Sequence, residues 1–436
     1  IGSGLVGSEM CIRDRSQTDR ELIKVDLGDN VDKSHPLSDA TAGRFNIALM
    51  NELGIDYATI GNNEGIGLAK DELDCLYEQA QFQPIIGNLK DEEGQPEWAK
   101  PYLVHKTKAG TKIAFLAYTF PYYLTYAPNG WQVLEPMARL EEDLARSEVR
   151  DADLVIVLSH LGVRYDEQIS ETYPQVNLVI GSHTHHLFEE GKLINETYLA
   201  AADRYGYFLG CIDLTVENGQ MIACQIEAIP TKDYILDLDK EDEAFIKAMR
   251  EEGHRRLAQE KVANLGRKLN FNETCQLVLQ AVCQETHSQL TLLNTGLIMK
   301  TLGPQVTMAD LQEALPHQMR MARLVVTGQE LKEICQEVFT KAELLKNQAI
   351  KGMGFRGKTF GEVITGNFAY KNGNLLYNRR VVDSNEKFSL VLVDQYYFAS
   401  YFPTIKEKEV TLLFPDLLRE LVAKYLRNNG ADWDKR

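Results

Sequence analysis

Residues 153–162 read DLVIVLSHLG, and residues 176–186 read VNLVIGSHTHH. Each stretch is a short apolar run that ends in a small residue and then in a side chain able to bind a metal ion. His160 takes that place in the first stretch, and His183 and His185 take it in the second. Short apolar runs bounded by turn residues are typical of buried strands. The sequence therefore predicts two strands with histidines at their carboxyl ends.

Two earlier stretches have the same order. Residues 22–30, LIKVDLGDN, lead to Asp29, and residues 56–64, DYATIGNNE, lead to Asn62. In an open α/β sheet the carboxyl ends of parallel strands lie at one edge, where loops converge and ligands bind. Strands that deliver carboxylate, amide and imidazole groups to one edge therefore predict a metal site.

No member of this set is specific by itself. A single His after a strand is usually an ordinary loop residue, Asp29 alone reads as a turn residue, and Asn62 suits a left-handed turn. In an extended segment side chains alternate, so we expect His183 and His185 to point to the same side, with Thr184 opposite. The joint pattern, rather than any one residue, carries the prediction.

The first half of the chain alternates between apolar runs and helical patterns, as α/β domains do. We predict strands at residues 22–27, 57–60, 112–118, 154–158 and 178–180, and helices at 40–53 and 70–81. Beyond a charge-dense stretch we predict helices at 273–282, 308–315 and 328–341, and strands at 289–293, 323–327 and 388–393. The predicted domains are therefore 16–236 and 263–436, both α/β, joined by a solvated linker helix over 237–262.

The charge balance narrows the range of partners. The 436 residues carry a formal net charge of −16, whereas proteins that bind nucleic acid polymers present basic faces. A small anionic substrate remains compatible, because bound divalent cations invert the charge of a local site. No run of eighteen apolar residues occurs, so no membrane span is expected. The seven scattered cysteines indicate mostly buried reduced thiols, and the oligomeric state and the compartment stay open.

The first residues have a different character. Residues 5–15, LVGSEMCIRDR, match one reading frame of a transposase adapter used in sequencing libraries. We interpret residues 1–15 as a non-native segment, with a genuine Gly- and Ser-rich leader as the alternative. On the first interpretation the native sequence begins near Ser16, and the original N-terminus has been replaced.

The order of these motifs resembles that of the calcineurin-like metallophosphatases, and within them the bacterial 5′-nucleotidase and UDP-sugar hydrolase family, whose motifs run D-x-H, G-D, G-N-H-[DE], H and G-H-T-H. Gly28-Asp29 matches the second motif, Gly61-Asn62 the first half of the third, and His160 the fourth. Residues 181–185, GSHTH, match the fifth with one inserted residue. The resemblance implies a four-layer αββα metallophosphatase sandwich followed by a smaller α/β C-terminal domain of the 5′-nucleotidase type.

The resemblance also implies two divalent metal ions of the Mn, Zn, Co or Fe type. Asn62, His160 and His183 are the expected ligands of one ion, and His185 is an expected ligand of the other. Asp29 is expected to bind both ions. The Asp and His of the first motif belong upstream of Glu21 and are expected to be missing, which would impair this chain. Two ions about 3.5–4 Å apart suit phosphate-ester hydrolysis by a metal-activated hydroxide, because they also neutralise charge on the phosphoryl oxygens.

One catalytic position departs from the family pattern. The third motif of the family supplies a His that stabilises the transition state, and this chain has Asn63 there, followed by Glu64. An amide donates a hydrogen bond but supplies neither a proton nor a charge. Three explanations stay open: the metals carry more of the chemistry, another group such as His186 substitutes, or the rate is low.

The second domain resembles the substrate-binding domain of the same family. Residues 290–316, LTLLNTGLIMKTLGPQVTMADLQEALP, match its N-x-G-G-I-R segment at Asn294, but Met299 stands where an Arg usually clamps the phosphate. Arg356 is the remaining clamp candidate, since a guanidinium binds phosphate bidentately. The phosphate-anchoring residues are therefore expected to differ from the family pattern.

Members of this family hold the base between two aromatic rings. The matches here are Phe360 and Tyr397, with Phe398 as an alternative to Tyr397, although such rings are equally common in a core. We therefore expect a 5′-nucleotidase-like enzyme that hydrolyses phosphate esters of nucleotides or related small molecules, with UDP-sugars and 2′,3′-cyclic nucleotides among the candidates. The alternative, favoured by Asn63 and Met299, is a catalytically weak nucleotide-binding protein that retains the fold.

Overall fold

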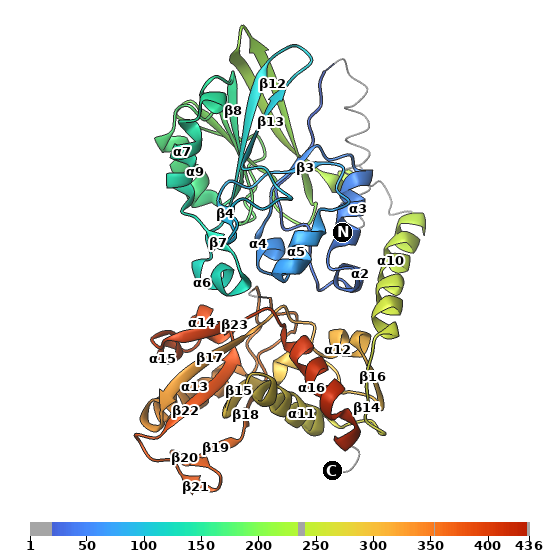
Figure 1. Cartoon of the computed structure of the whole chain (residues 1–436), viewed down its shortest axis with the longest axis vertical. Helices are drawn as coiled ribbons and strands as arrows, with labels where there is room; N and C mark the ends of the chain where they lie inside the picture. Colours follow the sequence, from blue (N-terminus) through green and yellow to red (C-terminus); the bar gives the residue numbers. More distant parts are fainter. Residues whose placement is uncertain (1–19, 234–239, 353, 434–436) are drawn as a thin grey trace. The chain divides into compact units, whose positions relative to one another are not determined.

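The computed structural model describes residues 20–233, 240–352 and 354–433, and within this part the chain forms two compact units (Figure 1). Unit 1 comprises the described residues up to Asp32 and Thr41–Glu251, and unit 2 comprises Lys33–Ala40 and the chain from Glu252 onward. The division falls inside helix α10 (Lys240–Gln259). The predicted segment 1–15 lies outside the described residues, and the predicted limits 16–236, 237–262 and 263–436 remain predictions.

Two sheets form the centre of unit 1. The smaller has three parallel strands in the order β1 (Val25–Asp26), β2 (Tyr57–Ala58) and β3 (Gln83–Pro84). The larger has six strands in the order β10-β11-β9-β8-β6-β5, and its four central strands run parallel. Its strands are β5 (Tyr102–Lys106), β6 (Lys112–Thr119), β8 (Leu154–His160), β9 (Leu178–Gly181), β10 (Lys192–Ile194) and β11 (Thr197–Ala201).

Alternation of side chains along β6 produces the layers of this unit. Ala114, Leu116 and Tyr118 face one way and join an apolar cluster with residues of three helices, which are α7 (Pro136–Leu144), α8 (Ser147–Arg150) and α9 (Val163–Thr172). The alternate residues face the small sheet, where the Phe115 and Tyr57 rings lie 5.1 Å apart. A third cluster joins the small sheet to α3 (Arg44–Glu52) and α5 (Lys70–Leu76). The predicted αββα sandwich is therefore confirmed.

The parallel strands place the predicted ligands at their carboxyl ends. Asp29 follows β1 and Asn62 follows β2, while His160 is the last residue of β8 and His183 lies two residues beyond β9. The pairing of β8 with both β6 and β9 is parallel and in register. The loops after β6, β8 and β9 therefore start from the same edge of the larger sheet, and β1 and β2 end side by side in the smaller sheet.

The prediction of one helix over 40–53 is wrong. The structure has α2 (Pro36–Ala40) and α3, separated by a turn in which Ala42 and Gly43 have positive φ angles of 47° and 81°. A Cβ on Gly43 would lie 2.8 Å from the Val31 side chain, so this turn requires glycine for both its backbone angle and its packing. Apolar periodicity alone does not reveal that interruption.

The longest strands of unit 1 are not among those predicted from the sequence. Strands β12 (Phe208–Glu217) and β13 (Gln220–Pro230) form an antiparallel hairpin. Only one face of the hairpin joins the apolar cluster between the sheets, through residues such as Ile212 and Leu214. Its mixture of apolar and charged residues therefore gives a weaker signal than the fully buried parallel strands.

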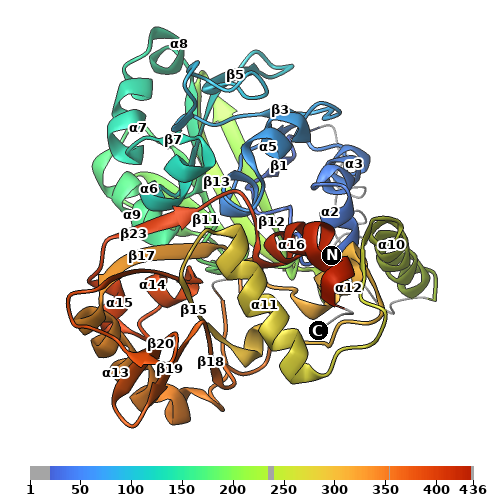
Figure 2. The same ribbon diagram turned by 60° about the horizontal axis from the view of Figure 1, so that its bottom comes forward.

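Unit 2 is built on one mixed five-stranded sheet. The strand order is β18-β15-β22-β17-β23, and the strands are β15 (Leu290–Asn294), β17 (Met321–Thr327), β18 (Val363–Gly366), β22 (Lys387–Val393) and β23 (Val410–Leu413). Its main helices are α11 (Phe271–Glu285), α12 (Met308–Ala314), α13 (Gly328–Leu345) and α16 (Leu418–Trp433). Figure 2 shows α11 and α16 as neighbours.

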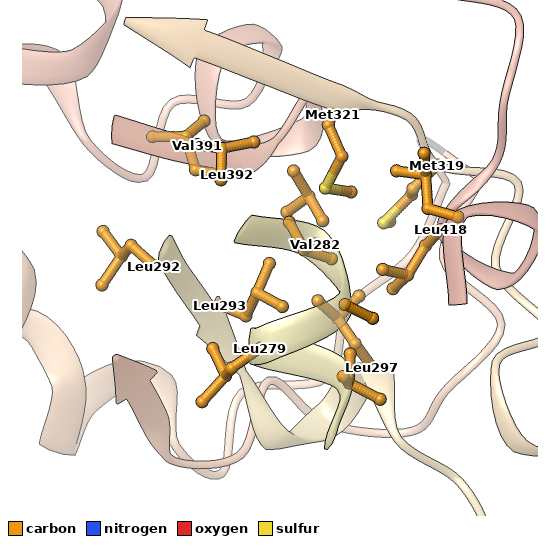
Figure 3. Close-up of a cluster of buried hydrophobic side chains, with 14 of the residues drawn as sticks. Leu279, Val282, Leu292, Leu293, Leu297, Met319, Met321, Val391, Leu392 and Leu418 are labelled. Atoms are coloured by element: carbon orange, nitrogen blue, oxygen red, sulfur yellow. The ribbon is translucent and has the colours of Figure 1, made fainter. Parts of the chain in front are cut away.

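Every residue of β15 is buried, so this strand lies at the centre of the unit. Figure 3 shows Leu293 of β15 close to Leu279 and Val282 of α11 in the apolar cluster that also includes Met321 of β17 and Leu418 of α16. A strand covered on both faces reads as a continuous apolar run. That is why the sequence predicted it clearly.

The short segment Lys33–Ala40 packs with unit 2 although its flanking residues belong to unit 1. Asp39 pairs with Arg419 at 2.9 Å, and the side chains are 6% and 0% exposed. Lys33 pairs with Glu420 at 3.2 Å. A buried ion pair leaves an uncompensated charge when one partner is removed, so this segment is integral to unit 2.

Two expectations about the chain as a whole concern membranes and cysteines. Among the residues that the structure describes, no helix has the length and apolar character needed to cross a membrane. The described cysteines are free thiols, of which Cys211, Cys275, Cys283 and Cys335 are buried and Cys75 and Cys224 are half-buried. The burial of these four cysteines agrees with the prediction from the sequence.

Candidate metal centre

Two glycines allow the loops after β1 and β2 to meet. Gly28 has a φ angle of 83°, and a Cβ there would lie 2.2 Å from the backbone nitrogen of Gly61. A Cβ on Gly61 would lie 2.1 Å from Oδ1 of Asp29. Neither gap admits a side chain. The Gly-Asp and Gly-Asn pairs in the sequence therefore reflect a close approach of two backbones.

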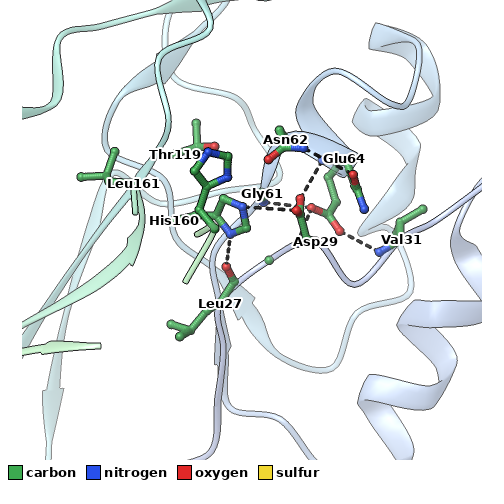
Figure 4. A network of polar contacts seen from close by, with 12 residues as sticks. Leu27, Asp29, Val31, Gly61, Asn62, Glu64, Thr119, His160 and Leu161 are labelled. Carbon is green, nitrogen blue, oxygen red and sulfur yellow. Dashed lines mark hydrogen bonds and ion pairs between the residues drawn. The ribbon is translucent and has the colours of Figure 1, made fainter. Parts of the chain in front are cut away.

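The buried carboxylate of Glu64 joins these two loops (Figure 4). Its Oε2 accepts hydrogen bonds from the N–H groups of Asp29 at 2.9 Å and Gly61 at 2.8 Å, and its Oε1 accepts one from Val31 at 2.8 Å. Burial, followed by the charge of Asp29, raises the pKa of Glu64 to about 7. Glu64 thus fixes the position of Asp29 through its backbone.

His160 presents one ring nitrogen to Asp29. Its Nδ1 lies 2.6 Å from the carbonyl oxygen of Leu27, which only accepts, so Nδ1 carries the proton in this arrangement. Nε2 then has a free lone pair, 3.4 Å from Oδ2 of Asp29, and it is buried without a hydrogen-bond partner. Burial lowers the pKa of His160, but the Asp29 carboxylate outweighs burial and the pKa is raised.

His183 is held by two residues of the loop after β6. The Phe120 ring stacks on the imidazole at 5.0 Å and 23°, and Oη of Tyr122 lies 3.3 Å from Nε2. Nδ1 is buried without a hydrogen-bond partner. Burial, and then the charge of His160, lower the pKa of His183 to about 4. His183 is therefore neutral near pH 7, which is the form that binds metals.

Together these side chains fit a divalent cation. One ligand atom from each of Asp29, His160 and His183 lies within 4.8 Å of the others, and Oδ1 of Asn62 is also buried without a hydrogen-bond partner. Buried polar atoms are nearly always hydrogen-bonded, so three unpartnered acceptors beside a carboxylate indicate a bound cation. Carboxylate, amide oxygen and imidazole form a ligand set that suits Mn, Fe, Co or Zn.

The loop after β9 differs from the expected extended segment. His183 and His185 have positive φ angles of 72° and 55°, so the alternation argument for their directions is wrong. His185 is exposed and lies outside the group of three described ligand atoms. His186 is exposed, with Nδ1 2.9 Å from Oγ1 of Thr184.

Asn63 serves the site through its backbone. Its N–H donates to Oδ1 of Asp29 at 2.7 Å, and its side-chain Oδ1 lies 3.4 Å from Nδ2 of Asn62. Any residue with a backbone N–H can make the first contact. The side chain at position 63 can therefore be changed, with an effect on the chemistry, while the backbone contact to Asp29 is kept.

The substrate residues predicted in unit 2 occupy different environments. Phe360 is 1% exposed, with its ring stacked on Tyr396 at 5.9 Å and 25°. A stacking role for Phe360 is contradicted by this burial. Asn294 is also buried, and its amide accepts from Oη of Tyr396 at 2.7 Å and donates to the carbonyl of Phe360. Both amide ends of Asn294 are thus used within the core.

The two remaining candidates are accessible. Arg356 is exposed, and its backbone N–H donates to Nδ1 of the buried His317 at 2.9 Å. Tyr397 is half-buried and meets Phe398 edge to face at 5.4 Å and 83°. The structure therefore does not bring Phe360 and Tyr397 together as a pair of parallel rings, and it leaves Arg356 and Tyr397 as candidates.

Phe120 and Tyr122, which contact His183, are not among the site residues predicted from the sequence. A signal was present, because both follow the strand predicted at 112–118, at the same strand end as the ligands. Aromatic residues are not common metal ligands, so a search for metal-binding side chains at strand ends does not find them. Contacts that orient a ligand are thus visible only in the folded chain.

The fold and the site define a calcineurin-like metallophosphoesterase with a C-terminal α/β domain. No family model matches the chain. It is 33% identical over 433 residues to the uncharacterized metallophosphoesterase YunD of Bacillus subtilis, across 94% of this chain and 92% of that protein. The chain belongs to this metallophosphoesterase family and is a hydrolase of phosphoric ester bonds.

Other relatives are 5′-nucleotidases. The Vibrio cholerae enzyme is 20% identical over 72% of this chain and 67% of its own length. Among solved structures, the NAD nucleotidase of Haemophilus influenzae has a TM-score of 0.63 at 15% identity, covering 98% of this chain and 90% of that chain. The 5′-nucleotidase precursor of Thermus thermophilus has a TM-score of 0.56 at 16% identity, covering 98% and 91%. These structures show that the fold is shared over both units.

Proposed function

We propose that this enzyme hydrolyses phosphate esters of nucleotides or related small molecules at the centre formed by Asp29, Asn62, His160 and His183. The observation that carries the proposal is the set of three buried acceptors without hydrogen-bond partners beside the Asp29 carboxylate. Nucleotide substrates are supported by the names of relatives and structural neighbours, which are 5′-nucleotidases and an NAD nucleotidase.

We assign the site two divalent ions, with Asp29 as the shared ligand and His185 as a ligand of the second ion. Such ions supply Lewis-acid polarisation of the phosphoryl oxygens and lower the pKa of the attacking water. The protein's part is to hold the ligands in fixed geometry. The Leu27 carbonyl orients His160, Tyr122 and Phe120 orient His183, and Glu64 holds the backbone of Asp29.

Asn63 is the proposed transition-state contact, through the hydrogen bonds that its side-chain amide donates to a phosphoryl oxygen. An amide stabilises growing negative charge but cannot protonate the leaving group. We therefore expect slower turnover than a His at this position would give. In unit 2, Arg356 is the proposed phosphate clamp and Tyr397 is the proposed stacking ring for the base. UDP-sugars and 2′,3′-cyclic nucleotides remain candidate substrates.

The test is Mn²⁺-dependent turnover of an aryl phosphate and of nucleoside monophosphates. His183→Asn is expected to lower kcat at least about 100-fold, because it removes an imidazole ligand. His287→Asn is a matched control, since His287 is an exposed residue of unit 2 with a similar positive φ of 51°. Equal rates for wild type and His183→Asn would overturn the proposed site.

The second candidate function is nucleotide binding with weak catalysis. It is favoured by Asn63 and by Met299, which is 41% exposed at the position where the family resemblance implies a clamping Arg. The adjacent Lys300 is paired with Glu313 at 2.7 Å and so offers no unpaired charge in its place. Calorimetry separates the two functions: tight nucleotide binding by the Mn²⁺-loaded protein without measurable turnover would favour the second.

A further inference from the structure

The loop at residues 202–207 lies beside the candidate metal centre. It follows β11, which pairs in parallel with β9 so that Ala201 is level with Gly181. The N–H of Asp203 donates to the carbonyl of His186 at 2.8 Å, and Leu187 forms a β-bridge with Ala202. The loop is therefore hydrogen-bonded to the segment that carries His183 and His185.

The backbone of this loop is held in an uncommon conformation. Asp203 and Tyr205 have φ angles of 59° and 58°, in the left-handed region that a bulky side chain rarely adopts. The other end of the loop is fixed by the buried Thr231, whose hydroxyl donates to the carbonyl of Gly206 at 2.6 Å. Such strain persists where the surrounding structure holds it, and it is concentrated at functional sites.

The side chains of the loop are chemically suited to an anion. Arg204 is exposed, and its guanidinium lies over the Tyr205 ring, 5.1 Å from the centroid. In the described part of the chain no carboxylate forms an ion pair with Arg204. A guanidinium stacked on a ring is partly preorganised and binds phosphate oxygens in a fork. Arg204 therefore has an unused anion-binding group next to the metal centre.

The aromatic residues extend this surface toward His185. Tyr205 is 70% exposed and Tyr207 is 57% exposed, and their rings meet edge to face at 5.8 Å. The Tyr205 ring lies 6.4 Å from the His185 ring. Tyr205 thus links the proposed ligand His185 to the guanidinium of Arg204.

We propose that Arg204, supported by Tyr205 and Tyr207, is a subsite for a second anionic group of the substrate, namely a phosphate attached to the scissile phosphate. This inference rests on the proposed function, because it assumes that the scissile phosphate lies at Asp29 and the histidines. Arg204 binds the distal phosphate oxygens, and Tyr205 holds the guanidinium plane. The subsite raises preference for diphosphates over monophosphates and adds no chemical step.

Binding of inorganic pyrophosphate and orthophosphate to the Mn²⁺-loaded protein tests the subsite by calorimetry. For Arg204→Gln we expect the Kd for pyrophosphate to rise about tenfold and the Kd for orthophosphate to stay unchanged, because only pyrophosphate reaches the guanidinium. The ratio of the orthophosphate Kd to the pyrophosphate Kd is therefore expected to fall about tenfold. Arg150→Gln is the matched control. Arg150 is exposed and precedes β8, so it lies at the opposite end of that strand from His160.

The variants give three distinguishable outcomes. Arg204→Lys is expected to weaken pyrophosphate binding less than Arg204→Gln does, because lysine keeps the positive charge but loses the bidentate geometry of the guanidinium. A ratio that stays at the wild-type value in Arg204→Gln, or an equal loss for both anions, would overturn the subsite. Failure of the wild-type protein to hydrolyse an aryl phosphate would instead overturn the proposed function, whatever the anion ratio.

Discussion

Oη of Tyr122 lies 3.3 Å from Nε2 of His183, whose other ring nitrogen is buried without a hydrogen-bond partner. Because this hydroxyl contacts Nε2, we infer that Nδ1 is the ligand atom of His183. We expect Tyr122→Phe to weaken Mn²⁺ binding by about 10- to 100-fold, as loss of a ligand-orienting partner does. Competition with a metal-sensitive dye measures this. Tyr123→Phe, at a neighbouring site that is 52% exposed, should leave the affinity unchanged, and an equal effect of both variants would exclude the orienting role.

Gly61 tests the close approach of the two ligand loops. In Gly61→Ala the new methyl group would lie 2.1 Å from Oδ1 of Asp29 and 2.6 Å from Cε1 of His160. We expect loss of metal binding and destabilisation of about 3 kcal/mol, because both contacts are overpacked. Gly210→Ala is the control, since its Cβ meets nothing closer than 3.5 Å. Full metal binding by Gly61→Ala would show that these loops separate at little cost.

Asn63→His tests whether the side chain at position 63 limits the rate. The Asp29 contact comes from the backbone N–H, so the substitution leaves that geometry in place. An imidazole can donate a proton to the leaving group, and we expect kcat for an aryl phosphate to rise about 100-fold, at the lower end for general acid catalysis. Asn63→Ala should lower kcat. A rate that is the same in all three proteins would mean that no side chain at position 63 takes part.

His317 gives unit 2 a pH-dependent stability. Burial, reinforced by the charge of Arg356, lowers the pKa of His317 to about 4, while an unfolded chain has a pKa near about 6.5. The unfolded state therefore binds the proton first as the pH falls. The contribution of neutral His317 to the free energy of unfolding is fully present above about pH 6.5. It decreases as the pH falls toward about 4, by up to about 3 kcal/mol.

Hydrogen exchange of residues 290–316 at pH 7 and pH 5 measures this effect, after correction for the intrinsic exchange rate. His317→Asn keeps an acceptor for the Arg356 N–H but does not titrate in this range. We expect the variant to lose less stability than wild type between the two pH values. An equal loss in both proteins would assign the pH dependence to other groups.

The apolar strands and the residues at their ends could be read from the sequence because burial on both faces leaves little choice of residue type. β8 and β15 are buried along their whole lengths, and His160 is the last residue of β8. The turn at Gly43, the left-handed backbone of His183 and the burial of Phe360 could not be read in this way. Each depends on residues distant in the sequence, such as Val31 for Gly43 and Tyr396 for Phe360.

The position of Lys33–Ala40 limits how this protein can be divided or recombined. A fragment that begins at Glu252 would lack Asp39 and leave Arg419, which is fully buried, without its carboxylate. It would also uncover Gly253, where an added Cβ would lie 2.2 Å from the backbone of Leu37. Exchange of either half between family members at a single junction would therefore separate residues that pack together. A functional chimera must carry the eight residues 33–40 together with the C-terminal half. The unit that can be exchanged is therefore encoded by two separate stretches of the gene.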